Sequence, residues 1–180
     1  MFTTAPFRAA QAEAYVALGA NLGDRASNLR ASCLGLQAGG VVIVARSGVF
    51  ETDAVAQPTQ DDAQDEAQPA YLNAALRVHT SLRPEALLAL AMLVEQTLGR
   101  KRSRATRWAS RTADIDLLLY EDHIQDANGL TLPHPRLLER AFVRVPLAQV
   151  ARPGLAHPVT GERLDVWPSS AGVRPWPETI

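Results

Sequence analysis

Two aspartates one residue apart, Asp114 and Asp116, are the residues of this chain best placed to do chemistry. They belong to an apolar run, residues 113–120, whose alternation predicts a β-strand. The side chains expected on its core-facing side are Ala113, Ile115, Leu117 and Leu119. Both aspartates then lie on the opposite face, about 6.5–7 Å apart along the strand. Adjacent carboxylates repel each other and lose hydration on burial, so the pair favours two divalent metal ions. The alternative is a solvated strand edge.

A basic stretch, residues 100–111, directly precedes this strand and contains no acidic residue. Its six cationic side chains are Arg100, Lys101, Arg102, Arg104, Arg107 and Arg111. Trp108 is costly to expose in such a polar loop and suits stacking on a flat ligand. Carboxylates, metal and arginines together indicate a nucleoside triphosphate substrate, over which the loop would close to exclude water. A solvated or RNA-contacting loop is the alternative.

Two further segments carry side chains suited to binding. Tyr71 and Asn73 share one face of a predicted strand, and a ring beside an amide suits a planar heterocycle with donors and acceptors on its edge. A packed tyrosine with a hydrogen-bonded asparagine is the structural alternative. His134 lies in a proline-bounded turn without a second His or Cys at ligand spacing, which argues against zinc and favours a phosphate contact or a capping role. Arg140 and Phe142 follow it.

Composition limits the classes of protein that the chain can belong to. It has 180 residues, 47% of them hydrophobic and 21% charged, as expected for one globular domain. The net charge of -1 gives no general attraction to nucleic acid or membrane. Cys33 is the only cysteine, which excludes an intrachain disulfide and a cysteine-based zinc cluster. Residues 1–13 do not form a signal peptide pattern, so we expect a flexible tail and a cytoplasmic protein.

Alternating strand and helix patterns predict an α/β or α+β domain. We expect strands over residues 14–19, 41–50, 71–80 and 113–120, with an irregularity at Ser47–Gly48. We expect helices over residues 24–38, 84–98 and 135–150, and a small hairpin that turns at Asn128–Gly129. Residues 56–69 have the composition of a mobile acidic loop, and the proline-containing C-terminal segment is expected to wrap the surface. No P-loop motif is present.

Taken together, these segments resemble the 6-hydroxymethyl-7,8-dihydropterin pyrophosphokinase family of folate biosynthesis, over about residues 15–158. The similar segments are YVALGANLGD (15–24), QPAYLNAA (68–75), GRKR (99–102), RWASRTADIDL (107–117) and LPHPR (132–136). The resemblance implies a ferredoxin-like three-layer α-β-α sandwich with a mostly antiparallel sheet. It also implies transfer of the β,γ-pyrophosphoryl group of ATP to the pterin hydroxymethyl oxygen, with release of AMP.

The resemblance further implies a role for each candidate residue. The catalytic and metal-binding set would be Arg100, Arg111, Asp114 and Asp116, the two aspartates holding two Mg²⁺ ions. ATP would contact Glu95, Arg100, Arg102, Arg111, His134 and Arg140. The pterin would contact Tyr71, Asn73, Trp108 and Phe142. The domain would span residues 14–160, with a C-terminal extension over 161–180, and act as a monomer that binds neither nucleic acid nor membrane. The alternatives are a non-catalytic ferredoxin-like RNA-binding domain and a magnesium-dependent nucleotidyltransferase, which would release pyrophosphate.

Overall fold

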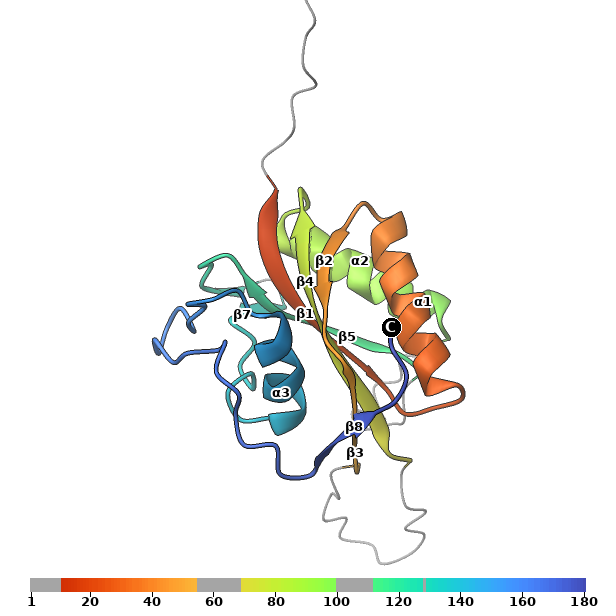
Figure 1. The fold of residues 1–180 in the computed structure, drawn as a ribbon. Coiled ribbons are helices and arrows are strands. Elements are labelled where there is room, and N and C mark those ends of the chain that lie inside the picture. Colours follow the sequence, from red (N-terminus) through yellow and green to blue (C-terminus); the bar gives the residue numbers. More distant parts are fainter. Residues whose placement is uncertain (1–10, 55–68, 100–111, 128) are drawn as a thin grey trace, which may run out of the picture.

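A computed structural model of the chain describes residues 11–54, 69–99, 112–127 and 129–180. The helices are α1 (Arg25–Ala38), α2 (Pro84–Thr97) and α3 (Ala141–Val150). The strands are β1 (Ala12–Ala20), β2 (Val42–Arg46), β3 (Val49–Thr52), β4 (Tyr71–Thr80), β5 (Asp114–Tyr120), β6 (Gln125–Ala127), β7 (Leu130–Leu132) and β8 (Val173–Trp176). Figure 1 shows a twisted sheet with α1 and α2 against one face and α3 against the other. The expected three-layer arrangement is therefore confirmed.

The main sheet has the order β5-β1-β4-β3-β8, and β2 pairs with the other half of β4. Every pair of strands in it is antiparallel. The expected irregularity at Ser47–Gly48 divides one predicted strand into β2 and β3. At this break the Ser47 hydroxyl accepts a hydrogen bond from the Ala75 N–H at 2.8 Å. The expected hairpin is also present, as the pair β6 and β7.

Local chemistry accounts for the helix ends and for one close helix contact. The Asp24 carboxylate accepts the N–H of Ser27 at 3.0 Å and so caps α1, as predicted. Gly35 of α1 lies against α2, where a Cβ atom would stand 2.7 Å from a methyl carbon of Val94. Only glycine allows this approach. The prediction of a helix from residue 135 is wrong, because residues 135–139 form turns and α3 begins at Ala141.

Two apolar clusters fill the layers on either side of the sheet. One contains Leu29 and Leu87 from α1 and α2 together with Ile115 and Leu117 from β5. The other packs α3 against the sheet and contains Leu119. The prediction that Leu119 shares a face with Ile115 and Leu117 is therefore wrong. The register between β1 and β5 shifts at this point, and the extra residue turns Leu119 to the α3 face of the sheet.

The same shift corrects the expectation for Tyr120. The sequence places it on the aspartate face with Leu118, but in the structure it packs against the cluster beneath α1 and α2. Its hydroxyl donates to the carbonyl of Leu82 at 2.8 Å.

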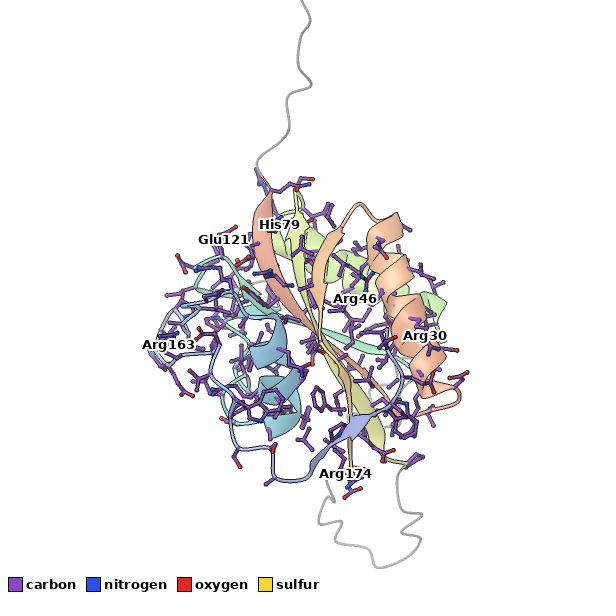
Figure 2. All side chains as sticks on the ribbon, viewed as in Figure 1. Arg30, Arg46, His79, Glu121, Arg163 and Arg174 are labelled. Carbon is purple, nitrogen blue, oxygen red and sulfur yellow. The ribbon has the colours of Figure 1, made fainter. Side chains whose placement is uncertain are left out.

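The C-terminal segment is part of the sheet. Within the expected extension, residues 161–180, strand β8 pairs with β3 and places Arg174 opposite Glu51. Side chains of the segment's end reach α1, where Arg30, labelled in Figure 2, forms an ion pair with Glu178. Among the described residues, no helix is both long enough and apolar enough to cross a membrane.

Candidate active site

The candidate site lies on the α3 face of the sheet, where a row of four residues crosses four strands. The strand registers set Asp114 of β5 opposite Gly19 of β1, Gly19 opposite Asn73 of β4, and Asn73 opposite Phe50 of β3. A Cβ atom on Gly19 would stand 3.7 Å from the Cβ of Asp114 and 3.9 Å from the Oδ1 of Asn73. Gly19 therefore leaves space between a carboxylate and an amide. The sequence analysis missed this glycine because its "GAN" context indicates only a turn.

The two aspartates project from the half of β5 that precedes the register shift. Ile115 between them belongs to the cluster under α1 and α2, so both carboxylates face α3, as predicted. The side chain of Glu95, on α2, is only 2% exposed and accepts the N–H of Ile115 at 2.8 Å. Glu95 thus holds the backbone between the aspartates from the opposite side of the sheet. Its contact with ATP remains a prediction.

Cationic groups gather opposite these carboxylates. Burial and the neighbouring Arg136 lower the pKa of Arg140, while Asp116 and Asp114 act in the opposite direction. Burial is also the main cause that lowers the pKa of His134, and the charges of Arg140 and Arg136 add to it. Asp114 again opposes this shift. The structure therefore brings His134 and Arg140 together with the aspartates. It adds Arg136, which the sequence analysis left out.

A hydrogen bond orients the imidazole of His134. Its Nδ1 accepts the backbone N–H of Arg136 at 3.2 Å, which assigns the ring proton to Nε2 when the ring is neutral. The backbone N–H of His134 donates to Leu118 O at 2.9 Å and ties the turn to β5. The ring is half-buried, and its lowered pKa favours the neutral form. His134 can then donate one hydrogen bond from Nε2 without adding a charge.

The amide of Asn73 is held by β3. Its Nδ2 donates to Thr52 Oγ1 at 3.0 Å and to the carbonyl of Phe50 at 3.4 Å. These bonds direct the amide nitrogen toward β3 and leave Oδ1 toward the space beside Gly19. Tyr71, two residues earlier on β4, shares this face and is half-buried. Thr52 is a positioning residue that no local sequence pattern reveals, because its partner lies 21 residues away.

Phe142 lies in the first turn of α3. It packs against the cluster between α3 and the sheet, and the guanidinium carbon of Arg140 lies 5.4 Å from its ring centroid. In the structure Phe142, a predicted pterin contact, therefore lies beside Arg140, a predicted ATP contact. Four other predicted site residues, Arg100, Arg102, Trp108 and Arg111, lie outside the described residues, and their roles remain predictions.

The donor set of the site suits magnesium. Within the described parts of the chain, no group of three or more His, Cys, Asp or Glu residues forms a complete metal cage. Mg²⁺ is usually held by one or two carboxylates together with substrate phosphates and water. Asp114 and Asp116 on one open face, beside groups able to bind phosphate, match that kind of site.

Comparison with known proteins gives the family. The family described as 7,8-dihydro-6-hydroxymethylpterin-pyrophosphokinase (HPPK) matches residues 15–152. The chain belongs to this family. Two of its relatives are named 2-amino-4-hydroxy-6-hydroxymethyldihydropteridine pyrophosphokinase. The one from Bacillus subtilis is 40% identical over 89% of this chain and 93% of its own length. The one from Methylorubrum extorquens is 42% identical over 77% of this chain and 82% of its own length.

Solved structures agree with the HPPK fold. Wild-type Plasmodium falciparum HPPK-DHPS superposes with a TM-score of 0.59 at 12% identity over 86% of this chain. A second HPPK-DHPS structure, in complex with substrates, gives a TM-score of 0.62 at 13% identity. The chain spans 44% and 42% of the length of these two chains, so it corresponds to less than half of each. At this level of identity the likeness shows the fold alone.

Proposed function

We propose that this HPPK-family enzyme transfers the β,γ-pyrophosphoryl group of ATP to the hydroxymethyl oxygen of 6-hydroxymethyl-7,8-dihydropterin and releases AMP, in the cytoplasm and as a monomer. Membership of the family and the names of its relatives support the pyrophosphokinase activity and its place in folate biosynthesis. The observation that carries the assignment of the site is the space at Gly19, between the carboxylates of β5 and the amide of Asn73.

The pterin binds on the β4 side of this space. Tyr71 and Phe142 come from the sheet and from α3, and their rings cover the two faces of the heterocycle. The Oδ1 of Asn73 accepts a hydrogen bond from an N–H group on the edge of the pterin, since its Nδ2 already donates to Thr52. Trp108 covers the ligand from the basic stretch, residues 100–111.

The triphosphate binds on the β5 side. Asp114 and Asp116 would hold two Mg²⁺ ions, which would supply charge neutralisation for the phosphate oxygens. The residues that contact the triphosphate oxygens are Arg100, Arg102, Arg111, His134 and Arg140. Glu95 holds β5 from the α2 side of the sheet by accepting the N–H of Ile115.

Alignment and electrostatics carry the reaction. The protein aligns the hydroxymethyl oxygen with the β-phosphorus, while the arginines stabilise charge on the departing AMP. The hydroxymethyl oxygen bonds to the β-phosphorus while the bond from that phosphorus to the oxygen bridging the α- and β-phosphates breaks and releases AMP. The hydroxyl proton passes to solvent water as the new bond forms. Among the described residues, His134 is oriented to donate from Nε2, which fits a phosphate contact better than the role of a general base.

The nucleotide product tests this proposal. Purified protein is incubated with ATP, Mg²⁺ and hydroxymethyldihydropterin, and the products are separated by ion-exchange chromatography. We expect AMP and diphosphorylated pterin in equal amounts, and no AMP without the pterin. Release of pyrophosphate would instead identify a nucleotidyltransferase. RNA binding with strong salt dependence and without turnover would identify a binding domain.

A further inference from the structure

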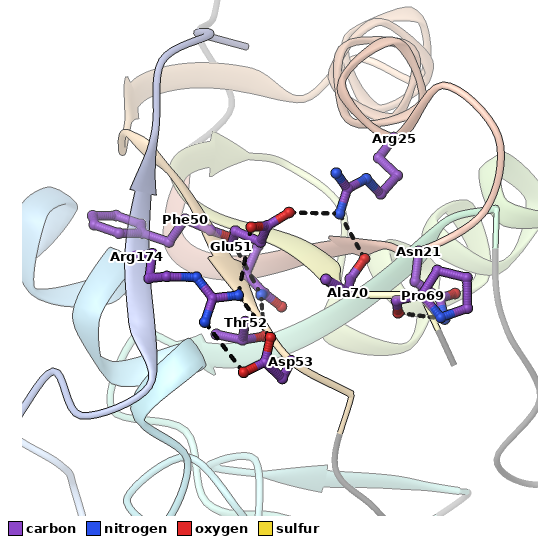
Figure 3. A network of polar contacts seen from close by, with 10 residues as sticks. Asn21, Arg25, Phe50, Glu51, Thr52, Asp53, Pro69, Ala70 and Arg174 are labelled. Atoms are coloured by element: carbon purple, nitrogen blue, oxygen red, sulfur yellow. Dashed lines mark hydrogen bonds and ion pairs between the residues drawn. The ribbon is translucent and has the colours of Figure 1, made fainter. Parts of the chain in front are cut away.

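Side chains from three distant parts of the chain meet around the connection between β3 and β4. The two ends of this connection are Asp53, directly after β3, and Pro69–Ala70, directly before β4. Figure 3 shows a polar network around both ends, with Arg174 from β8 on one side and Arg25 from α1 on the other. Because these residues are far apart in sequence, only the folded chain assembles the network.

Arg174 holds the first end. Its NH2 donates to Asp53 Oδ1 at 2.7 Å and its NH1 to Asp53 Oδ2 at 3.2 Å, which is a two-pronged contact. The same NH2 lies 3.5 Å from Glu51 Oε2. This arginine lowers the pKa of the Asp53 carboxyl group, and the aspartate in turn raises the pKa of the guanidinium. Backbone pairing of β8 with β3 sets Arg174 opposite Glu51.

Arg25 holds the second end. Its NH1 donates to the carbonyl of Ala70 at 2.7 Å and to Glu51 Oε1 at 3.0 Å. Its guanidinium carbon lies 5.0 Å from the ring centroid of Trp176 in β8. This cation–π contact helps to hold the arginine in place. Glu51 therefore bridges the two arginines, one oxygen to each. The side chains of Arg25 and Glu51 are 21% and 22% exposed, whereas Asp53 is 78% exposed, so the inner half of the network is the better shielded.

The network lies next to the backbone of the residues that bind the pterin in the proposed site, on the opposite face of the sheet. Thr52 pairs with Tyr71 across β3 and β4, directly between the two anchored ends. The hydroxyl of Thr52 orients Asn73, and Tyr71 follows Ala70 in the chain. A shift of either end would therefore move the ring of Tyr71, the amide of Asn73, or both.

We propose that Arg174 and Arg25, bridged by Glu51, are positioning residues for pterin recognition. The inference rests on the proposed placement of the pterin at Tyr71 and Asn73. It assigns the C-terminal strand a part in substrate binding, although no residue of that strand touches the substrate. The triphosphate side of the site is built on β5, which β1 and β4 separate from β3 in the sheet.

The test compares Arg174→Met with Arg163→Met. Arg163 makes a similar two-pronged contact with Asp165 in the same C-terminal segment, at 2.7 and 2.6 Å, and has no contact with β3 or β4 among the described residues. Calorimetry gives the Kd of the pterin at saturating Mg²⁺ and non-hydrolysable ATP analogue, and separately the Kd of the analogue. Thermal unfolding is recorded for each variant.

We expect Arg174→Met to raise the pterin Kd roughly 3- to 10-fold, from loss of a surface ion pair and of alignment, with the analogue Kd within about twofold of wild type. Arg163→Met should leave both constants unchanged. Arg174→Lys should recover part of the pterin affinity, because lysine restores the charge without the fork.

Other results overturn the inference. An unchanged pterin Kd in Arg174→Met would show that the network has no role in pterin binding. Equal weakening of both ligands, together with lower thermal stability than Arg163→Met, would show a general structural role. If wild-type protein forms AMP and binds pterin while Arg174→Met is unaffected, only this inference fails. If wild-type protein neither binds pterin nor forms AMP, the proposed function fails as well.

Discussion

The two ends of β1 contribute differently to the α3 face of the sheet: one supplies a buried tyrosine ring, and the other supplies a glycine without a side chain. At one end the ring of Tyr15 is 2% exposed, its hydroxyl donates to Glu13 Oε1 at 2.9 Å, and it accepts the Arg152 N–H at 3.3 Å. Arg152 also donates to Glu13 at 3.0 Å, which closes the cluster. At the other end Gly19 contributes no side chain, and the space lies between Asp114 and Asn73.

This difference shows what separates a structural polar cluster from a binding site. In the Tyr15 cluster the polar atoms are directed at one another, and burial raises the pKa of Tyr15 to about 12. At Gly19 the absence of a side chain instead leaves space between Asp114 and Asn73, and His134 and Arg140 are close enough for Asp114 to act on their pKa.

Replacing the carboxylate of Asp114 or of Asp116 should abolish turnover. We expect Asp114→Asn and Asp116→Asn to reduce AMP formation by about 1,000-fold or more, because each removes a metal-ligating charge worth several kcal/mol in the transition state. Circular dichroism should show an unchanged fold. Asp122→Asn, at an exposed turn beyond the other end of β5, is the matched control and should keep wild-type activity. Near-normal rates in either site variant would refute the metal assignment.

Filling the space at Gly19 should reduce activity in steps. A Cβ atom there meets its neighbours at ordinary contact distances, so Gly19→Ala should fold normally. We expect kcat/KM for the pterin to fall about 10-fold in Gly19→Ala and about 100-fold in Gly19→Val, because misplacement of reacting groups by about 1 Å has effects of this size. Steady-state kinetics and thermal unfolding measure both. Full activity in the valine variant would show that no ligand occupies this space.

Removing the rings should affect one ligand only. We expect Tyr71→Ala and Phe142→Ala to raise the pterin Kd about 10-fold, since a ring contact contributes roughly 0.5–1.5 kcal/mol beyond buried area. The Kd of an ATP analogue should stay nearly constant. Calorimetry on the separate ligands measures this, with Tyr71→Phe as the control that keeps the ring. Equal losses for both ligands would mean that the rings only support the fold.

The Tyr15 cluster should make the stability of the fold depend on pH without affecting catalysis. The folded state holds the Tyr15 proton more tightly than the unfolded chain, where the pKa is 10.0, so stability is intact below pH 10 and falls as pH rises toward about 12. Tyr15→Phe lacks this group, and its stability should decline less over that range. Urea unfolding at pH 9, 10 and 11 measures the difference. Turnover at pH 8 should be unchanged, and an unchanged pH dependence of stability would contradict the burial of this hydroxyl.

Strong local patterns predicted much of the fold correctly. The bounds of β4, the cap at Asp24 and the hairpin after β5 follow from apolar alternation and turn chemistry, which depend on neighbouring residues. The faces of Leu119 and Tyr120 were predicted wrongly, because the register shift depends on how β5 meets β1 about 100 residues earlier. Sequence periodicity in one strand carries no information about such a shift.

The same distinction between local patterns and distant partners applies to the candidate site. The two aspartates and the pair Tyr71 and Asn73 were found from residue type and spacing, whereas the roles of Arg140 and Phe142 were implied by the family resemblance. Their supports were not found, because Thr52, Glu51 and Arg174 act through partners distant in the chain. The bond from the Ile115 N–H to Glu95 crosses 20 residues and is likewise invisible in the local pattern.

The place of β8 at the edge of the sheet has a consequence for protein synthesis. Asp53 and Arg174 are 121 residues apart. At typical rates of roughly 5–20 residues per second, about 6–24 seconds of translation separate them. Throughout that interval the outer edge of β3 exposes backbone donors and acceptors to other nascent chains. This edge therefore stays available for pairing with other chains until β8 has been made, and slow codons between residues 54 and 172 would prolong its exposure.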